Sequence, residues 1–188
     1  MSGIDKKIIS MLTKDGRISL TDMGRALGVT HVAVGKRLNR LVQEGYVRVQ
    51  GLLSPDKLGL KLVLIFAEVE SPQDMQKLVE NFKECPRMVF LATLMGGYNF
   101  IALMIAEDKE VLESITSICC IRRAKGIRRS DVMIIGELIR PNHMPMEIFV
   151  EKRYKKPPCK YVDCEICPRY LNNKCPGCPA FEGYRGWL

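Results

Sequence analysis

The sequence predicts an α+β protein in three parts, and three observations predict it. Helical patterns in residues 1–50 are typical of a winged helix-turn-helix domain. After a connecting strand in residues 51–59, residues 60–147 follow the order β-α-β-β-α-β of a ferredoxin-like domain. Residues 148–188 contain most of the cysteines, and this composition predicts a basic linker followed by a Cys-rich metal-binding tail.

Composition and charge narrow the class of protein. The chain of 188 residues is 47% hydrophobic and 27% charged, which is typical of a globular protein and excludes a disordered one. Its apolar runs are too short to span a membrane and it opens without a secretion signal, so we expect a cytoplasmic protein with no membrane partner. Residues 1–50 carry a net charge of +5, residues 51–150 carry −1, and residues 151–188 carry +4. Basic ends favour a polyanionic partner.

Three helices are predicted in residues 1–50. The first ends near Asp15, the second begins after Ser19 and ends before Gly28, and the third begins after Thr30 as its N-cap. Residues 46–50 alternate between apolar and polar side chains and predict a short strand, the wing. Two helices joined by a tight turn that contains glycine form a helix-turn-helix, whose second helix fits the major groove of DNA.

The predicted partner of this motif is therefore double-stranded DNA. Side chains at the N-terminal end of the third helix are expected to face base edges, and cations farther along it are expected to contact phosphates. The candidate DNA-binding residues are Thr30, His31, Val32, Lys36, Arg37, Arg40 and, on the wing, Arg48. The alternative is a three-helix core whose basic face is only solvated.

The middle of the chain predicts four strands and two helices. The strands are residues 60–69, 87–95, 99–106 and 127–139, and the helices begin after Ser71 and at Asp108. This part has no Gly-rich phosphate loop, no paired acids in an apolar setting and no nucleophile near a histidine, so we expect no enzymatic activity. An open sheet leaves a face to cover, which predicts a homodimer.

These parts together resemble the Lrp/AsnC family, the leucine-responsive or feast/famine transcriptional regulators. The similarity covers about residues 3–147 and includes GlyLeuLeuSerProAspLysLeuGly at 51–59 and MetGlyGlyTyrAsnPhe at 95–100. The resemblance implies a sequence-specific DNA-binding regulator that forms dimers, often assembles into octamers, and binds a small effector, commonly an amino acid.

The resemblance also implies an effector site at the hairpin formed by Gly96, Gly97, Tyr98 and Asn99. The family usually has Asp where Asn99 stands, and an amide lacks the charge that would pair with an effector ammonium group. The effector is therefore expected to differ from an amino acid or to be absent. The alternative is that the two glycines only support the hairpin turn.

A second class of function is an enzyme that decarboxylates sirohaem-type tetrapyrroles, since some proteins that resemble this fold have that activity. It requires cationic and imidazole side chains in the cleft between domains. Residues 88–95 are apolar here, and the two histidines, His31 and His143, lie elsewhere. The sequence therefore favours the regulator.

The tail has the spacing Cys159-x4-Cys164-x2-Cys167-x7-Cys175-x2-Cys178. Two C-x2-C pairs can supply a tetrahedral four-thiolate site, so Cys164, Cys167, Cys175 and Cys178 are the predicted zinc ligands, with Cys159 as a fifth candidate. Lys160, Arg169 and Lys174 are expected to offset the thiolate charge.

Two alternatives to zinc remain open. The spacing of the first three cysteines is similar to that of plant-type iron–sulfur proteins, and such a cluster would make the protein a sensor of oxygen or redox state. Disulfides are the other alternative. The remaining cysteines, Cys85, Cys119 and Cys120, are interpreted as small buried apolar residues without a function.

Overall fold

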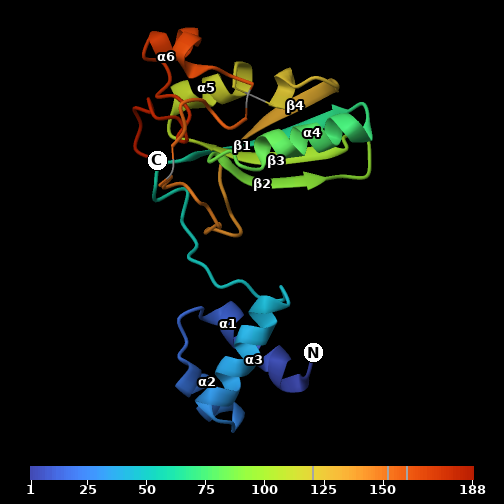
Figure 1. The fold of residues 1–188 in the computed structure, drawn as a ribbon, viewed down its shortest axis with the longest axis vertical. Helices are drawn as coiled ribbons and strands as arrows, with labels where there is room; N and C mark the ends of the chain where they lie inside the picture. Colours follow the sequence, from blue (N-terminus) through green and yellow to red (C-terminus); the bar gives the residue numbers. More distant parts are fainter. Residues whose placement is uncertain (120, 152, 160) are drawn as a thin grey trace. The chain divides into compact units, whose positions relative to one another are not determined.

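A computed structural model describes residues 1–119, 121–151, 153–159 and 161–188, so Cys120, Lys152 and Lys160 lie outside the described residues. The chain divides into two compact units, Met1–Gly51 and Leu52–Leu188, and each is described by itself (Figure 1). No helix in these described ranges has the length and apolar character needed to cross a bilayer.

The first unit contains the three predicted helices: α1 (Gly3–Lys14), α2 (Leu20–Leu27) and α3 (His31–Gln43). The preceding residue caps each helix, because the hydroxyl groups of Ser2, Ser19 and Thr30 each accept a hydrogen bond from a backbone N–H in the first turn. The helices enclose a small core of Ile8, Met23, Val34 and Leu41.

The turn between α2 and α3 brings the two helices close together. Gly28 ends α2 in the left-handed conformation, with φ +68°, and the Val29 N–H donates to the carbonyl oxygen of Gly24 over 3.0 Å. A Cβ at Gly24 would lie 2.7 Å from the Val29 carbonyl oxygen, so a larger residue would force the turn open. This turn fixes the helix-turn-helix geometry.

The predicted wing is wrong. Residues 46–50 do not form a strand, and the backbone N–H groups of Tyr46 and Val47 instead donate to the carbonyl oxygen of Leu41 at the end of α3. A strand is stable only when it pairs with another, and residues 1–51, all of which are described, offer none. The alternating pattern reflects Val47 packing against the three-helix core.

The second unit contains the predicted four-stranded sheet and its two helices. The elements are β1 (Lys61–Val69), α4 (Pro72–Phe82), β2 (Met88–Thr93), β3 (Phe100–Ala106), α5 (Lys109–Ser117) and β4 (Ile127–Ile135). The sheet is antiparallel with the order β2-β3-β1-β4, which confirms the βαββαβ topology. The second and fourth strands are shorter than predicted.

The predicted connecting strand is reduced to a single bridge. Leu53 pairs with Met144 through two backbone hydrogen bonds of 2.9 and 2.8 Å. The rest of residues 51–59 is irregular or in turns, because Pro55 and Gly59 interrupt the extended backbone. This bridge ties the start of the second unit to the chain that follows β4.

The two faces of the sheet are covered by different parts of the chain. Helices α4 and α5 cover one face, where Ile65, Ala102 and Met104 are fully or almost fully buried (Figure 1). On the other face, Leu62 and Ile105 pack with residues that come after β4. These later residues are Met146, Ile148, Tyr184 and Leu188.

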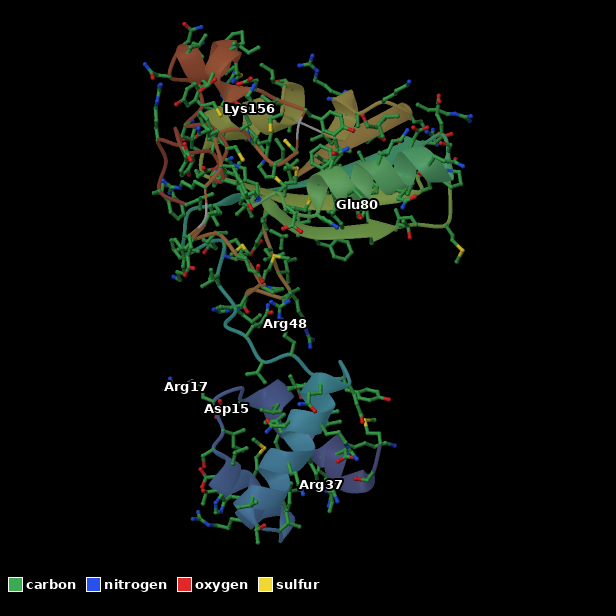
Figure 2. The ribbon with its side chains drawn as sticks, viewed as in Figure 1. Asp15, Arg17, Arg37, Arg48, Glu80 and Lys156 are labelled. Carbon is green, nitrogen blue, oxygen red and sulfur yellow. The ribbon has the colours of Figure 1, made fainter. Side chains whose placement is uncertain are left out.

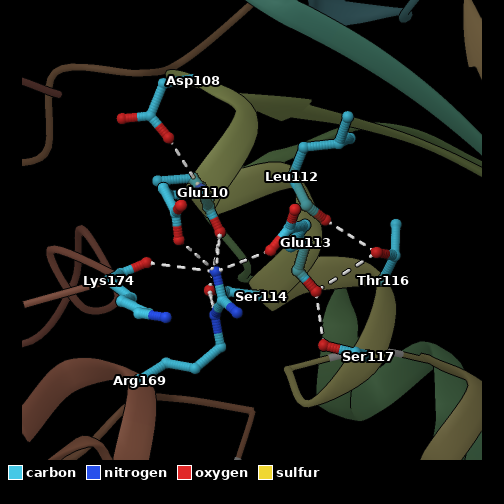
Figure 3. Close-up of polar contacts among 10 residues, drawn as sticks. Asp108, Glu110, Leu112, Glu113, Ser114, Thr116, Ser117, Arg169 and Lys174 are labelled. Carbon is cyan, nitrogen blue, oxygen red and sulfur yellow. Dashed lines mark hydrogen bonds and ion pairs between the residues drawn. The ribbon is translucent and has the colours of Figure 1, made fainter. Parts of the chain in front are cut away.

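The tail begins at Cys159, and its described residues pack on the rest of the second unit, here called the sheet unit, at several points. The ring of Tyr161 stacks on Phe82 of α4, with the ring centroids 5.3 Å apart. Arg169, in the short helix α6 (Pro168–Leu171), contacts α5, and Figure 3 shows its guanidinium between Glu110, Glu113 and Ser114. The carbonyl oxygen of Gly177 accepts a hydrogen bond of 3.0 Å from Arg87. The tail thus shares its core with the sheet unit.

Candidate nucleic-acid interface and thiol sites

The N-terminal end of α3 is open to solvent. Thr30, His31 and Val32 are all exposed, and Val32, an apolar residue, is 66% exposed. The Thr30 hydroxyl is committed to the helix cap through the Ala33 N–H at 3.2 Å. The first turn of α3 therefore presents side chains that no other part of the first unit covers.

The following turns of α3 line a shallow hollow of about 640 Å³. Its walls combine three cations with polar side chains: Ala33, Lys36, Arg37, Asn39, Arg40 and Gln43. Three of the predicted phosphate contacts thus lie on one surface, and Figure 2 shows Arg37 on this helix. Sequence reasoning missed Asn39 and Gln43, although their helical spacing from Lys36 could have placed them on the same face.

Two of these arginines are held in place by one buried acid. The carboxylate of Asp5 in α1 is fully buried and accepts Arg37 at 3.1 Å and Arg40 at 2.8 Å. A backbone hydrogen bond from Ser2 is the main cause that keeps the pKa of Asp5 far below its ordinary value, and the two arginines add to it. The arginine side chains remain 36% and 48% exposed. The buried Asp5 carboxylate therefore orients both arginines, whose exposed parts can still bind an anion from solution.

Asp5 was not among the sequence candidates. An Asp three residues after Ser2 signals a capping box, and this box is present: the Ser2 N–H donates to the Asp5 carboxylate at 2.7 Å. Its second role appears only when α1 packs against α3. Arg48, by contrast, is exposed on the irregular segment that follows α3 and is not among the residues that line the hollow (Figure 2).

The predicted effector hairpin is held by bonds within the fold. The Asn99 amide accepts from the Val69 N–H at 2.7 Å and donates to the Val69 carbonyl oxygen at 2.8 Å. Asp could accept the first bond but could not donate the second. This paired bond gives a structural reason for the amide at a position where the family usually has Asp.

The other hairpin residues contact β4. The Tyr98 hydroxyl donates to Asp131, a bond that raises the pKa of Tyr98, and the guanidinium of Arg129 lies 4.6 Å from the centre of the Tyr98 ring. Arg129 also donates to the Gly97 carbonyl oxygen at 3.0 Å. The hairpin is therefore fastened to β1 and β4, the two strands that lie beyond β3 in the sheet.

The four predicted zinc ligands lie near one another in the tail. Burial raises the pKa of Cys164 to about 11, and the nearby Cys178, Cys175 and Cys167 thiols add to this shift. Across the described part of the chain, no group of three or more His, Cys, Asp or Glu side chains is arranged to hold a metal ion. The four sulfurs are neighbours, and burial favours the protonated thiol at Cys164 and at Cys178.

The predicted charge compensation of the tail is only partly visible. Arg169 is committed to α5, with its guanidinium 2.7 Å from Glu110 and 2.6 Å from Ser114. It also donates to the backbone carbonyl oxygen of Lys174 at 3.5 Å. Lys160 lies outside the described residues.

The fifth candidate, Cys159, has a different partner. The Cys119 thiol at the end of α5 hydrogen-bonds to Cys159, and this bond is the main reason that the pKa of Cys159 is lowered to about 6. Cys85, after α4, interacts electrostatically with both sulfurs. Sequence reasoning assigned no function to Cys85 or Cys119, and their distance from the tail in sequence gave no signal for this contact.

Comparison with known proteins agrees with the fold and with a helix-turn-helix domain in the first unit. Residues 1–42 match the AsnC-type helix-turn-helix domain. The transcriptional regulator LrpA of Pyrococcus abyssi is 32% identical over 114 residues, which are 60% of this chain and 81% of LrpA.

Two crystal structures show the same fold. That of PH0061 aligns with a TM-score of 0.68 and 19% identity, over 73% of this chain and 94% of that one. The complex of the Neisseria meningitidis regulator NMB0573 with L-Met aligns with a TM-score of 0.66 and 16% identity, over 74% and 92%. The names of these relatives give no support to a decarboxylase. The chain belongs to the Lrp/AsnC family of DNA-binding transcriptional regulators.

Proposed function

We propose that this regulator recognises specific DNA sites through α3, with base contacts from its first turn and phosphate contacts from the hollow beside it. One observation carries the proposal: Lys36, Arg37 and Arg40 line a single open surface, and a buried carboxylate orients two of them. A helix of this kind fits the major groove, where its N-terminal side chains reach base edges. Thr30, His31 and Val32 occupy that end of α3.

The three cations differ in what each would contribute to DNA binding. Arg37 and Arg40 share their charge with Asp5, so their gain on meeting a phosphate is partly offset by that existing pair. Lys36 is exposed, and its contact with a phosphate would be the most purely electrostatic of the three. We therefore assign the non-specific, salt-dependent part of binding mainly to Lys36, with the arginines fixing the orientation.

We also propose that the protein acts as a homodimer, which can build larger assemblies such as octamers. The sheet face opposite α4 and α5 is only partly covered by the chain itself, and Phe90 and Met133 are 47% and 53% exposed. A second copy would bury this surface and supply a second α3. Recognition helices of such a dimer read half-sites about 34 Å apart, or a multiple of this distance.

The effector and the metal are separate parts of the proposal. The L-Met complex of NMB0573 supports a small effector in the family. The Asn99 amide is occupied by Val69, so an effector at this hairpin would have to rely on Gly96, Gly97 and Tyr98. For the tail we propose zinc on Cys164, Cys167, Cys175 and Cys178, because zinc would displace the thiol protons and draw these neighbouring sulfurs together.

The DNA proposal is tested by selecting bound fragments from a random duplex library and measuring their affinity across salt concentrations. For Lys36→Ala we expect weaker binding to all duplexes, with the slope of log Kd against log salt shallower by about 0.9, the contribution of one phosphate. Lys14→Ala, an exposed lysine at the end of α1, is the matched control. His31→Ala should change the selected sequence more than the slope. An unchanged slope in Lys36→Ala would contradict the assigned orientation of α3.

The metal proposal is tested by elemental analysis and an optical spectrum of protein purified without oxygen. Zinc at one ion per chain, lost in Cys164→Ser, is the expected result. Iron together with a visible charge-transfer band would show that the tail holds an iron–sulfur cluster instead of zinc. Protein that contains neither metal even after incubation with zinc would refute a metal centre.

L-Met is the first effector to test, by its effect on Tm.

A further inference from the structure

A group of arginines surrounds a hollow in the sheet unit. The end of α5, the short 3-10 helix η1 (Ile121–Arg123) and the start of β4 line this hollow, whose volume is about 690 Å³. In the described sheet β4 is an edge strand, so its outer side is not covered by a further strand. Its four cationic lining residues, all exposed, are Arg122, Arg123, Arg128 and Arg129.

Two of these arginines are partly neutralised by nearby acids. Arg129 lies 2.8 Å from the Glu68 carboxylate, and Arg128 lies 3.6 and 3.7 Å from the carboxylates of Glu68 and Glu70. The side chains of both arginines remain more than half exposed. Arg129 also donates to the Gly97 carbonyl oxygen at 3.0 Å, so its guanidinium is held in place while part of it still faces solvent.

The other two arginines supply positive charge that is not offset. Within the described ranges, neither Arg122 nor Arg123 forms an ion pair. The Nε of Arg122 donates to the Ser130 hydroxyl at 3.0 Å, which orients the guanidinium and leaves its other N–H groups available. The acids that pair with Arg128 are fewer than the arginines of the hollow, so the hollow has a positive excess.

We propose that this hollow binds a small compound that carries two or more adjacent phosphate groups. A guanidinium is planar, stays protonated and binds two phosphate oxygens through parallel hydrogen bonds. Four of them around one hollow match a ligand with several neighbouring negative charges better than a compound with a single carboxylate. The volume of the hollow lies in the range of small-molecule sites, which is about 300–1,000 Å³.

The rest of the lining restricts which part of the ligand is recognised. The hydroxyls of Thr116 and Ser117 already donate to backbone carbonyl oxygens of α5, so their protons are not available to a phosphate (Figure 3). Ile127 adds a small apolar surface, and the lining residues that the structure describes include no aromatic side chain. A nucleobase would have no ring to stack on. The phosphate chain is therefore the recognised part.

The arrangement favours a compact ligand over a DNA strand. A strand of DNA presents single phosphates spaced along its backbone, whereas the guanidiniums here line one hollow at the edge of the sheet. The site lies wholly within the second unit. It does not depend on DNA binding by α3 or on zinc in the tail, so its failure would leave those proposals untouched.

The experiment titrates the full-length protein with inorganic tripolyphosphate, pyrophosphate and orthophosphate by isothermal titration calorimetry. The ionic strength is kept constant, because salt screens exposed charges. We expect tripolyphosphate to bind most tightly and orthophosphate most weakly. ATP carries the same phosphate chain on a nucleoside and should bind with an affinity similar to that of tripolyphosphate, because the base has no stacking partner.

Three variants locate the binding. Arg123→Ala should weaken the affinity for tripolyphosphate by about tenfold or more, as expected for the loss of hydrogen bonds to a charged group. Lys125→Ala is the matched control, since Lys125 is an exposed cation of the same segment that does not line the hollow, and it should change the affinity less than about twofold. Lys36→Ala should keep the binding, which separates this site from the cationic hollow beside α3. Arg123 is exposed, so the Tm of its variant should match wild type.

Four results would overturn the proposal. The first is no binding of tripolyphosphate to wild type, and the second is equal affinity for all three phosphates. The third is binding that is lost in Lys36→Ala but kept in Arg123→Ala, or that falls equally in Lys125→Ala and Arg123→Ala. The fourth is unchanged tripolyphosphate binding in Arg123→Ala together with weaker binding of duplex DNA, which would assign the arginines to DNA instead.

Discussion

The two units use the same kind of ion pair for different purposes. In the first, Asp5 is buried but its partners Arg37 and Arg40 keep a third or more of their side chains in solvent. In the second, Arg87 and Glu107 are 5% and 4% exposed, so both members are buried. A partly exposed arginine can bind a further anion, whereas a buried arginine can only stabilise the fold. The exposure of the arginine therefore distinguishes an ion pair on a binding surface from an ion pair that only stabilises the fold.

The enclosed pair holds the tail as well as the sheet. Arg87 lies before β2 and Glu107 after β3, and the guanidinium also donates to the Gly177 carbonyl oxygen. The Tyr184 hydroxyl donates to the same Glu107 carboxylate at 2.7 Å. Four groups from the sheet and the tail thus satisfy one another away from water. Because every member relies on the others, loss of one leaves a buried charge or polar atom unpaired.

The largest expected effect comes from Arg87→Met. This change leaves the Glu107 carboxylate buried without its cation, which is expected to lower the free energy of unfolding of the second unit by about 3–5 kcal/mol. Urea denaturation followed by fluorescence of Trp187, the one tryptophan of the chain, measures it. Arg128→Ala breaks exposed pairs with Glu68 and Glu70 and should cost less than about 1 kcal/mol. Equal losses in the two variants would refute the contrast between enclosed and open pairs.

Asn99→Asp should have the next largest effect. The carboxylate cannot donate to the Val69 carbonyl oxygen and would face it with like partial charge, at a cost of about 1–3 kcal/mol at neutral pH. The same denaturation experiment measures it. Asn142→Asp, in an exposed loop, introduces the same change in charge and should be close to neutral. A stable Asn99→Asp variant would show that the hairpin does not need the paired bond.

Asp5→Asn tests the open pair directly. The amide cannot neutralise Arg37 and Arg40, so we expect the Tm of the first unit to fall by roughly 5 °C or more. Asp22→Asn is the matched control, since Asp22 occupies the same position in α2 but has an exposed side chain. Circular dichroism melts of the two variants give the comparison. A greater loss in Asp22→Asn would show that Asp5 acts only as part of a helix cap.

The pH dependence of the same pair has a definite sign. Because the folded pKa of Asp5 is lowered, its contribution to stability is fully present above the ordinary value of 3.8 and is lost as pH falls toward the folded pKa. The Tm difference between wild type and Asp5→Asn should therefore be constant from pH 7 to about pH 5 and shrink below the ordinary carboxyl pKa. Melts recorded along this range check it. A difference that widened in acid would be incompatible with a carboxylate stabilised by arginine.

The smallest expected effect on stability is that of Lys36→Ala. Lys36 is exposed on α3, so its removal should leave the Tm of the first unit within about 2 °C of wild type, since surface substitutions change stability little. Arg40→Ala should lower both the Tm and the affinity for DNA, because Arg40 pairs with the buried Asp5 and also lies on the surface proposed to bind DNA. Thermal melts beside fluorescence anisotropy on the same duplex separate the two. If both variants had the same Tm, the second role of Arg40 would be absent.

Local signals explain which parts of the fold could be predicted from the sequence. Ser19 and Thr30 cap helices as predicted, because an N-cap depends only on residues within the same turn. The period of apolar residues likewise located α4, α5 and the four strands of the sheet, although not the short helix α6. Residues 46–50 show the limit of such signals, since their alternation has the period of a strand but the first unit, all of which is described, contains no strand to pair with them.

The site could be predicted only in part for the same reason. Lys36, Arg37 and Arg40 share a helical face, which their spacing determines. The burial of Asp5 behind two of them depends on how α1 packs on α3, and no spacing within either helix reports it. Cys119 and Cys159 are an even clearer case, because the pair exists only where the tail packs on α5.

The sequence by itself determined the kinds of element, their order and the cationic face of α3, since each follows from residues near one another along the chain. Only the tertiary structure decided which arginines are open and which are enclosed, that the tail shares a core with the sheet, and which cysteines meet. These properties depend on burial and on contacts between distant segments. Burial sets the strength of an ion pair and the pKa of a thiol, and it arises only when the elements pack.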